Sequence, residues 1–387
     1  MNTRTWAEID FDALKFNIKQ IRRITDKKAM VMAVVKADAY GHGAAECSKI
    51  LLENGADRLG VACYDEAIQL RRAGIEAPIL ILGASFEEEI EELVKNDITI
   101  TVFSYEFAAK ISNVAKNLSK TAKIHIKLDT GMTRIGYLAD IDDNKITDEI
   151  IDISKLDNIE IEGIFSHFST ADEKDSEYTK LQFERFIKVC DMLKEKGLDI
   201  PIKHIANSAA IMMYPETHLD MVRAGIILYG IYPSDEVDKT KINLKSVMSV
   251  KSKITCIREV APNRGVSYGK MYITKGRTQI AAVPIGYADG YTRMLSGRAK
   301  MLVCGKSVDV IGKICMDQCM IDVTDVNNIN VGDEVTVFGS QTVTADDLAA
   351  ALGTIPYEIL CMISKRIPRY FKENGKTVEI LNYLDKI

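Results

Sequence analysis

A lysine that ends a short apolar segment is the first residue of this sequence whose surroundings suit chemistry. Lys36 follows AMVMAVV directly, where a buried strand would end. Desolvation at such a place lowers the pKa of an amine toward the range in which it acts as a nucleophile. The alternative interpretation is a lysine whose stem covers the strand end while its ammonium group reaches water. Taken alone, Lys36 favours the lysine that reaches water. The residues around it favour the nucleophilic amine instead.

The context is a pair of segments suited to a phosphate group. Ser208 stands before the helical stretch AAIMMY, at an N-cap position that suits an anion. Gly225 has no side chain, so the backbone around it can approach a phosphate closely. A reactive lysine opposite a phosphate site indicates a phosphorylated aldehyde cofactor held as a Schiff base. Pyridoxal 5'-phosphate (PLP) fits that description.

Arg223 is the candidate partner for the ring nitrogen of such a cofactor. PLP sites use an acidic residue or an arginine for this purpose, and no acidic residue lies beside the proposed phosphate segment. An arginine does not readily give up its proton, so the ring is a weaker electron sink. The proton then returns to Cα, which favours racemisation over transamination. On its own, Arg223 is equally well interpreted as a structural ion-pair partner.

The elements that must position these residues alternate regularly. Apolar, β-branched segments are separated by amphipathic stretches whose apolar residues recur at spacings of three and four residues, as in a helix. This rhythm predicts a (β/α)₈ TIM-type barrel, with catalytic residues at the carboxyl ends of its strands; a doubly wound open sheet is the other candidate. No GxGxxG follows the first segment, which weakens the dinucleotide fold. The predicted strands lie within 29–36, 58–63, 78–83, 98–103, 123–128, 159–165, 202–206 and 221–230.

The hydrophobic pattern of the sequence changes after about residue 240. Period-2 alternation broken by Gly, Asn and Asp predicts a mostly antiparallel β domain. We therefore expect a PLP-binding barrel domain over 1–240 and a β-rich C-terminal domain over 241–387. The first ~10 residues are able to pack with the C-terminal domain. Thr344 is the expected N-cap of a helical interlude within it.

Composition excludes several classes of protein. The 387 residues carry a net charge of −5 with 47% hydrophobic residues, which fits a globular protein and neither a nucleic-acid binder nor a disordered chain. The sequence shows no secretory signal and no apolar run of the ~18 residues that a membrane span needs. Eight cysteines without a CxxC pair indicate reduced thiols in the cytoplasm. No metal site is predicted, since none of the five histidines lies at ligand spacing with cysteines.

A set of motifs along almost the whole chain resembles bacterial alanine racemases. The longest are AVVKADAYGHG (33–43), KLDTGMTRIG (127–136), SHFSTAD (166–172), HIANSAA (204–210), MVRAGIILYG (221–230), PIGYADGYTR (284–293) and CMDQCMID (315–322), with VSYG (266–269) and PYEILC (356–361). The resemblance implies a PLP-dependent racemase that interconverts L- and D-alanine and supplies D-alanine for cell-wall peptidoglycan. It also implies a barrel, a β-rich second domain and a head-to-tail homodimer with shared active sites.

Motif by motif, the resemblance assigns roles to residues of this sequence. Lys36 is the Schiff-base lysine and one catalytic base, and Tyr268 is the opposite base, contributed by the other subunit. Two bases on opposite faces are the simpler arrangement, because racemisation removes Cα–H from one face and returns a proton to the other. Arg223 faces the ring nitrogen, with His204 hydrogen-bonded to it, and His167 packs near the ring.

The remaining assignments concern the phosphate and the substrate. The phosphate positions are Tyr40, Ser208, Gly225, Ile226 and Tyr357, with Asn207 beside them. Arg134 holds the cofactor's phenolic oxygen and the substrate carboxylate side, and Lys127, often carbamylated in the family, orients it. Met316 offers a backbone N–H to the substrate carboxylate, Asp317 follows in the same loop, and Tyr287 belongs to the entryway.

Two positions depart from the family pattern. Asp38 replaces a commoner Asn, and Lys313 replaces an Arg of the entryway, which puts the gating contacts there in doubt. A serine or broad-spectrum racemase is the neighbouring alternative, although Tyr357 favours a methyl-sized side chain. Barrel-type PLP decarboxylases would show an acidic ring-nitrogen partner. Non-catalytic PLP-binding carrier proteins would lack the second domain.

Overall fold

The structure, a computed structural model that describes residues 4–386, divides into two compact units. The barrel unit comprises Leu14–Ala39 and Ala44–Lys245. The β-rich unit contains the chain up to Ala13, Tyr40–Gly43 and the chain from Ser246 onward. No helix in the described part of the chain is both long enough and apolar enough to cross a membrane.

Eight parallel strands form the core of the barrel unit, in the order β10-β2-β3-β4-β5-β6-β8-β9. The N–H of Arg223 in β10 donates to the carbonyl of Ala206 after β9 at 3.0 Å, so the two ends of the sheet meet and nearly close the ring. The predicted TIM-type barrel is confirmed. The strands are β2 (Met30–Val34), β3 (Arg58–Val61), β4 (Ile79–Ile81), β5 (Ile98–Val102), β6 (Ala122–Asp129), β8 (Ile159–Phe165), β9 (Ile202–His204) and β10 (Met221–Ala224).

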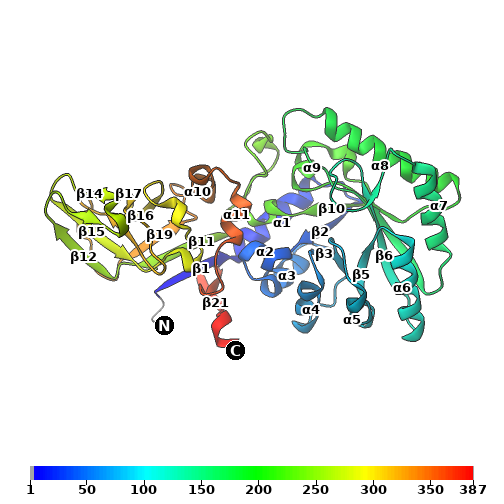
Figure 1. The fold of residues 1–387 in the computed structure, drawn as a ribbon, viewed down its shortest axis with the longest axis horizontal. Helices are drawn as coiled ribbons and strands as arrows, with labels where there is room; N and C mark the ends of the chain where they lie inside the picture. The colour runs from blue at the N-terminus through cyan, green and yellow to red at the C-terminus, as the bar shows by residue number, and fades with distance from the viewer. Residues whose placement is uncertain (1–3, 387) are drawn as a thin grey trace. The chain divides into compact units, whose positions relative to one another are not determined.

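Amphipathic helices cover the outside of the barrel (Figure 1). Their apolar faces pack on strands that are buried on both sides, which is why the strands are rich in Ile, Val and Leu. Residues next to a helix cap its first turn; at the start of α6, for example, the side chain of Ser104 accepts the N–H of Phe107. The helices are α1 (Phe11–Ile24), α3 (Ala44–Glu53), α4 (Tyr64–Arg72), α5 (Ile90–Lys95), α6 (Tyr105–Asn117), α7 (Asp143–Ser154), α8 (Glu177–Glu195) and α9 (Ser208–Met213).

The last barrel strand is shorter than the apolar segment predicts. β10 ends at Ala224, and the rest of the segment turns at Gly225 into the 3₁₀ helix η3 (Ile226–Tyr229). Apolar composition alone does not distinguish a strand from a buried helical turn, so the sequence predicted one strand across this boundary. The turn brings the backbone of Gly225 to the carboxyl end of the barrel.

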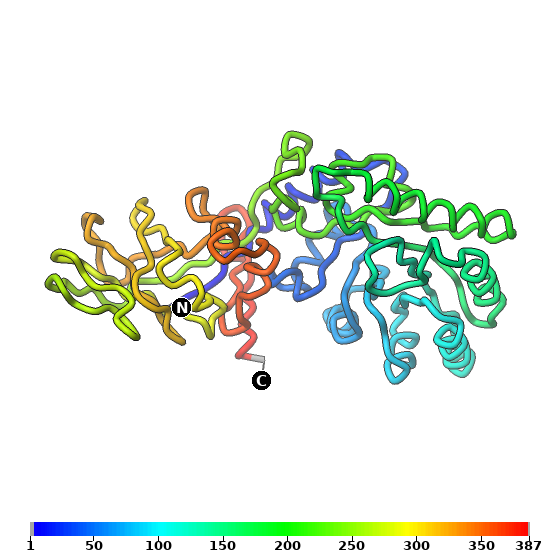
Figure 2. The backbone as a smooth tube through the Cα atoms, turned by 45° about the horizontal axis from the view of Figure 1, so that its top comes forward, coloured from blue at the N-terminus to red at the C-terminus, as the bar shows by residue number. Residues whose placement is uncertain are grey.

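The β-rich unit is built on a mostly antiparallel sheet in the order β12-β15-β18-β17-β16-β19-β11-β1-β20-β21. β1 (Thr5–Asp10) pairs with β11 antiparallel and with β20 parallel, so the blue N-terminal strand lies beside the red C-terminal segment in Figure 2. The other strands are β11 (Met248–Lys253), β12 (Cys256–Val260), β15 (Thr278–Val283), β16 (Lys300–Val303), β17 (Lys306–Ile311), β18 (Cys319–Asp322), β19 (Glu334–Phe338), β20 (Arg369–Glu373) and β21 (Lys376–Leu381).

Shorter elements complete the β-rich unit. The hairpin of β13 (Gly265–Val266) and β14 (Tyr272–Ile273) stands apart from the main sheet. The predicted helical interlude is two helices, α10 (Ala345–Leu352) and α11 (Pro356–Cys361), because Gly353 ends the first in the left-handed region with φ at 70°. Thr344 caps α10 as predicted, and its hydroxyl accepts the N–H of Asp347 at 3.0 Å.

A glycine in β8 tests how tightly the barrel interior is packed. A Cβ on Gly163 would lie 2.4 Å from Cε1 of His125 on the neighbouring strand, whereas a Cβ on Gly276 would meet nothing within 4 Å. We expect Gly163→Ala to lower the free energy of unfolding by about 1–3 kcal/mol through overpacking. Gly276→Ala, the matched control, should stay within about 0.5 kcal/mol of the wild type. Urea unfolding measures both, and equal midpoints for the two variants would contradict the packing argument.

Candidate active site

Lys36 opens a left-handed turn at the carboxyl end of β2. Residues 37–40 of this turn, α2 (Lys36–Gly41), have φ between 51° and 56°. Side chains other than glycine cost roughly 1–2 kcal/mol each in this conformation. Two carboxylates support the turn: Glu66 accepts the N–H of Ala37 at 2.6 Å, and Asp38 accepts that of Ala44 at 2.9 Å. The half-buried Lys36 is thus carried by backbone with few alternative conformations.

Positive charge concentrates around His167, which follows β8. Burial lowers the pKa of His167 well below its ordinary value, and the charges of Arg223, Lys127, Arg134 and Lys36 lower it further. The four predicted cationic residues of the barrel therefore act on one imidazole. His167 is held neutral, and the region around it favours anions.

Lys127 is the most buried of these amines. It is 4% exposed, and its Nζ lies 4.6 Å from the centroid of the Phe165 ring. Burial lowers the pKa of Lys127 well below its ordinary value, and the charges of Arg223 and Arg134 act in the same direction. This environment therefore disfavours the charged form of Lys127.

A single carboxylate shapes the loop that carries Arg134. Asp129, the last residue of β6, accepts backbone N–H groups from Gly131 and Thr133 at 2.9 Å and from Arg134 at 2.7 Å. Burial opposes the ionisation of Asp129, but the bonds from Thr133, Gly131 and Arg134 outweigh it and lower its pKa. The charged carboxylate fixes where the Arg134 side chain begins.

Arg223 is buried with carbonyl and imidazole partners. Its Nη1 contacts Nδ1 of His204 at 3.0 Å, and its Nη2 contacts Nδ1 of His167 at 2.9 Å. Nη2 also donates to the carbonyls of Ser166 and Ile205 at 2.8 and 3.0 Å. Within residues 4–386, no carboxylate hydrogen-bonds to this guanidinium. Burial lowers the pKa of Arg223 to about 9, and a neighbouring arginine contributes.

The predicted phosphate segments of the barrel unit meet each other. The hydroxyl of Ser208, at the start of α9, accepts the N–H of Gly225 at 2.9 Å. The N-cap of this helix is Asn207 and not Ser208 as predicted: Asn207 accepts the N–H of Ala210 at 3.0 Å, and Ser208 is the first helical residue. Ile226 begins η3 immediately after Gly225. A side-chain hydroxyl and the backbone at Gly225 therefore lie together, as a phosphate site requires.

Two predicted phosphate tyrosines pair within the β-rich unit. The rings of Tyr40 and Tyr357 have centroids 6.1 Å apart. Their segments are tied by Arg369, a 1%-exposed arginine that donates to the carbonyl of Gly41 at 2.9 Å and to that of Ile363 at 2.8 Å. Arg369 therefore fixes the backbone next to both tyrosines.

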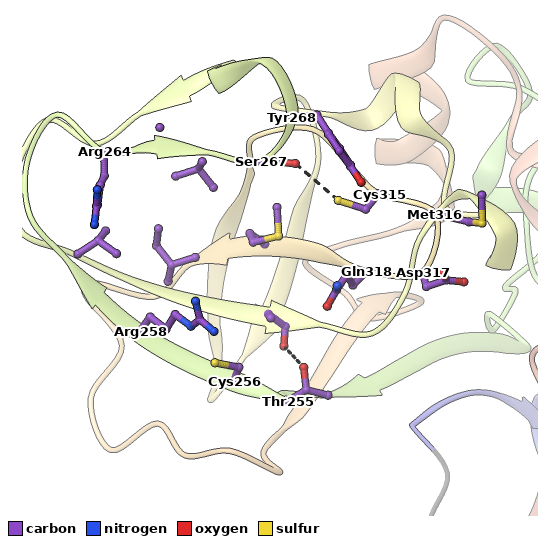
Figure 3. A pocket seen from close by; sticks show the side chains of 16 residues that line it. Thr255, Cys256, Arg258, Arg264, Ser267, Tyr268, Cys315, Met316, Asp317 and Gln318 are labelled. Carbon is purple, nitrogen blue, oxygen red and sulfur yellow. Dashed lines mark hydrogen bonds between the residues drawn. The ribbon is translucent and has the colours of Figure 1, made fainter.

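Tyr268 stands at a cavity of about 680 Å³ in the β-rich unit (Figure 3). Its ring is 66% exposed, and the backbone beside it is left-handed at Ser267, with φ at 62°. The Ser267 hydroxyl donates to the carbonyl of Lys313 at 2.6 Å and lies 3.6 Å from Sγ of Cys315. These contacts anchor the turn, so the exposed ring projects from a fixed base.

Met316 and Asp317 line the same cavity, and the backbone of Tyr287 is hydrogen-bonded to their loop. The N–H of Tyr287 donates to the carbonyl of Cys315 at 3.1 Å. Asp317 accepts from Arg366 at 2.9 Å. A Cβ on Gly286 would lie 2.3 Å from the carbonyl oxygen of Met316, so only glycine allows this close approach. Tyr287 and Met316 are 42% and 53% exposed.

The sequence-predicted residues thus form three groups. Lys36, Lys127, Arg134, His167, His204 and Arg223, with the Asn207, Ser208, Gly225 and Ile226 segment, lie in the barrel unit. Tyr40 pairs with Tyr357, and Tyr268 shares a cavity with Met316 and Asp317, beside the loop contacted by Tyr287; both groups belong to the β-rich unit.

Supporting residues escaped the sequence reasoning. Asp129 lies inside a quoted motif, and its signal was an acidic residue directly before a Gly- and Thr-containing loop. His125 had a signal too, because it alternates with Lys127 and Asp129 at period 2 on one buried strand. Glu66 and Arg369 gave no local signal, since each acts on backbone far away in sequence.

The chain matches known proteins over nearly its whole length. Residues 9–233 match the family described as alanine racemase, N-terminal domain, and residues 247–371 match alanine racemase, C-terminal domain. An alanine racemase of Methanococcus maripaludis is 54% identical over 95% of this chain and 98% of its own, and alanine racemase 1 of Clostridium acetobutylicum is 51% identical over 98% of each.

Solved structures agree with these relatives. An alanine racemase of Clostridium difficile 630 superposes with a TM-score of 0.97 at 48% identity, over 99% of this chain and 100% of that one. The alanine racemase of Bacillus anthracis with bound L-Ala-P superposes with a TM-score of 0.94 at 39% identity, over 100% of both chains. The chain therefore belongs to the alanine racemase family, enzymes that are isomerases acting on amino acids.

Proposed function

We propose that this protein interconverts L- and D-alanine with PLP by a two-base mechanism, with Lys36 on one face of the substrate and Tyr268 of a partner subunit on the other. The observation that carries the proposal is the bonding of Arg223, which meets imidazoles and carbonyls and, within residues 4–386, no carboxylate. Family membership supports alanine racemisation itself.

The residues of the barrel unit fit PLP. Lys36 offers a primary amine at a strand end for the cofactor's aldehyde carbon, and Ser208 with Gly225 and Ile226 offers a hydroxyl and backbone groups for its phosphate. Asn207 caps the helix that begins at Ser208, and we assign Tyr40 and Tyr357 to the same phosphate. His167 would pack against the ring. The excess of positive charge around His167 suits a dianionic phosphate and a substrate carboxylate.

Arg223 would direct the chemistry toward racemisation. PLP, when bound, withdraws electrons from the substrate's Cα. Arg223 would donate toward the ring nitrogen, and with a pKa of about 9 it keeps its proton at neutral pH. It would therefore not protonate the ring, which favours the return of a proton to Cα.

Residues of each unit are assigned to the substrate. Arg134 serves the carboxylate side and the phenolic oxygen, with Lys127 beside it; the lowered pKa of Lys127 suits an amine that adds carbon dioxide. The N–H of Met316, with Asp317 in the same loop, binds the carboxylate, and Tyr287 lines the entryway. These assignments rest on the motifs and on the loop geometry around the cavity.

We propose a homodimer because the second base is displayed outward. Tyr268, Met271, Ile273, Met294 and Met316 are large, exposed apolar or aromatic residues of the β-rich unit. Exposed apolar groups mark interfaces where they form a contiguous patch. In keeping with the resemblance, we place the protein in the cytoplasm and assign its D-alanine to cell-wall peptidoglycan. A racemisation assay over a panel of L-amino acids, with and without added PLP, tests the reaction and its substrate; no turnover of alanine would refute the proposal.

Lys36→Ala should abolish racemisation and the visible absorption of protein-linked PLP, because no other residue is proposed to supply the linking amine. Absorption spectra and chiral analysis of alanine measure the two effects. Lys49→Ala, which removes an exposed lysine from α3, is the control and should behave as wild type. Racemisation retained by Lys36→Ala would overturn the lysine assignment.

Tyr268→Phe should slow proton exchange for one alanine enantiomer by about 10²-fold or more, and much less for the other, because only one face loses its base. Deuterium uptake from D₂O into each enantiomer measures this asymmetry. Tyr272→Phe, on the same hairpin, removes a hydroxyl that contacts Asp322 and is the matched control. Equal losses for both enantiomers would argue against a one-sided base.

Ser208→Ala should weaken PLP binding about tenfold, since a hydrogen bond to a charged group contributes about 1.5 kcal/mol. Titration of the cofactor-free protein with PLP gives the affinity. Ser234→Ala removes a hydroxyl that donates to the carbonyl of Asp172 at 2.6 Å and serves as control. If both variants bind PLP as tightly as wild type, Ser208 has no part in holding phosphate.

A further inference from the structure

A chain of hydrogen bonds runs from Arg223 through the barrel interior to a carboxylate. His204 contacts Arg223 through Nδ1 at 3.0 Å, and its Nε2 lies 2.9 Å from Nδ1 of His125. Nε2 of His125 lies 3.2 Å from Oε2 of Glu162. Arg58 binds both oxygens of Glu162, at 2.6 and 2.8 Å. Two imidazoles thus separate the guanidinium from this buried carboxylate.

The carboxylate fixes the direction of every bond in the chain. A carboxylate only accepts, so His125 must carry its proton on Nε2. In neutral His125, Nδ1 is then an acceptor, and His204 must donate from Nε2. Nδ1 of His204 is left with a lone pair, which is what the donor Nη1 of Arg223 requires.

The charges support this single arrangement. Burial lowers the pKa of His204 well below its ordinary value, with Arg223 acting in the same direction. Burial also lowers the pKa of His125, although Glu162 opposes the shift. Burial raises the pKa of Glu162, but the bonds from Arg58 and His125 outweigh this effect and lower it. Two neutral rings and one ionised carboxylate are the consistent set.

The packing holds the rings in place. Gly163 lies opposite His125 in the register of β6 and β8, and its missing side chain leaves room for that ring. His204 stacks on Phe165 with centroids 4.8 Å apart and planes at 5°. Both rings are fully buried, so neither can turn to exchange partners with water.

We propose that Glu162 and His125 are positioning residues for Arg223: the carboxylate sets the tautomers of both histidines, so that His204 presents a lone pair and Arg223 keeps its orientation. The proposal rests on the proposed function in one respect, that Arg223 faces the ring nitrogen of PLP. If these hydrogen bonds ran in the opposite direction, an N–H of His204 would point at an N–H of Arg223, and the guanidinium would shift away.

The first test reads the tautomers in the cofactor-free protein. Two-bond ¹H–¹⁵N spectra of ¹⁵N-histidine-labelled protein distinguish protonated from unprotonated ring nitrogens, and the signals missing from His204→Gln identify His204. We expect His204 to be protonated on Nε2 in the wild type. A proton on Nδ1 would overturn the proposal without the need for any further variant.

Two substitutions of His125 sharpen this test. His125→Gln supplies an amide N–H toward Glu162 and a carbonyl oxygen toward His204, so it keeps the direction of the chain, whereas His125→Phe supplies neither. The His204 tautomer should persist in His125→Gln and become mixed in His125→Phe. An unchanged tautomer in His125→Phe would show that His125 does not set it, and the proposal would fail.

The second test uses the protein loaded with PLP. Since outer partners of a reactive group commonly affect activity 10–100-fold, we expect kcat for alanine to fall about tenfold in His125→Phe with little change in KM, and to recover largely in His125→Gln. Lys123→Met is the matched control, because Lys123 is 52% exposed and touches Glu162 at 3.2 Å outside the chain of rings; it should behave as wild type. Equal losses of kcat in both His125 variants would indicate a merely structural role and overturn the proposal.

The two tests separate the failure of this proposal from failure of the proposed function. A wild-type protein that neither binds PLP nor racemises alanine refutes the function, while the His204 tautomer still decides the direction of the chain. A wild-type protein that racemises alanine but carries the opposite tautomer refutes only the positioning role.

Discussion

The burial of one guanidinium constrains the carboxyl end of the barrel more than any other interaction. Arg223 is 3% exposed, so each of its N–H groups must find a partner inside the protein. Carbonyls after β8 and β9 and the imidazoles of His167 and His204 provide partners for Nη1 and Nη2. The two imidazoles accept only while their rings are neutral. The geometry of three strand ends and the protonation of two histidines are therefore set together.

The second constraint is the backbone that carries Lys36. The left-handed residues 37–40 would cost several kcal/mol if they stood alone, since each contributes roughly 1–2 kcal/mol. Glu66 and Asp38 offset part of this by accepting the N–H of Ala37 in the turn and that of Ala44 at the start of α3. Strain of this kind persists where surrounding structure over-determines it, and here it fixes the starting point of the Lys36 side chain.

The sequence predicted those features that depend on residues close together along the chain. Period and composition predicted all eight barrel strands and the change to a β-rich second unit, because burial on one or both faces leaves a readable pattern. The turn after Lys36 escaped, since Ala37, Ala39 and Tyr40 are residue types that rarely adopt a left-handed backbone. The contact of His125 with Gly163 escaped as well, because it depends on the register of two strands and on a bulge between them. Tyr268 was selected by its motif and not by its composition, in a chain with 15 tyrosines.

The net charge of −5 conceals a local arrangement of the opposite sign. Arg134 and burial lower the pKa of Arg223, and both arginines act with burial on Lys127, so these cations destabilise one another in the protein alone. Asp129, the nearby carboxylate, is occupied by backbone N–H groups. Anions that enter this region relieve the repulsion and gain hydrogen bonds from fixed donors, so their binding is coupled to the protonation of Lys127 and Arg223. The repulsion stored among these side chains would thus favour binding of the doubly anionic cofactor and the carboxylate substrate that we propose for this region.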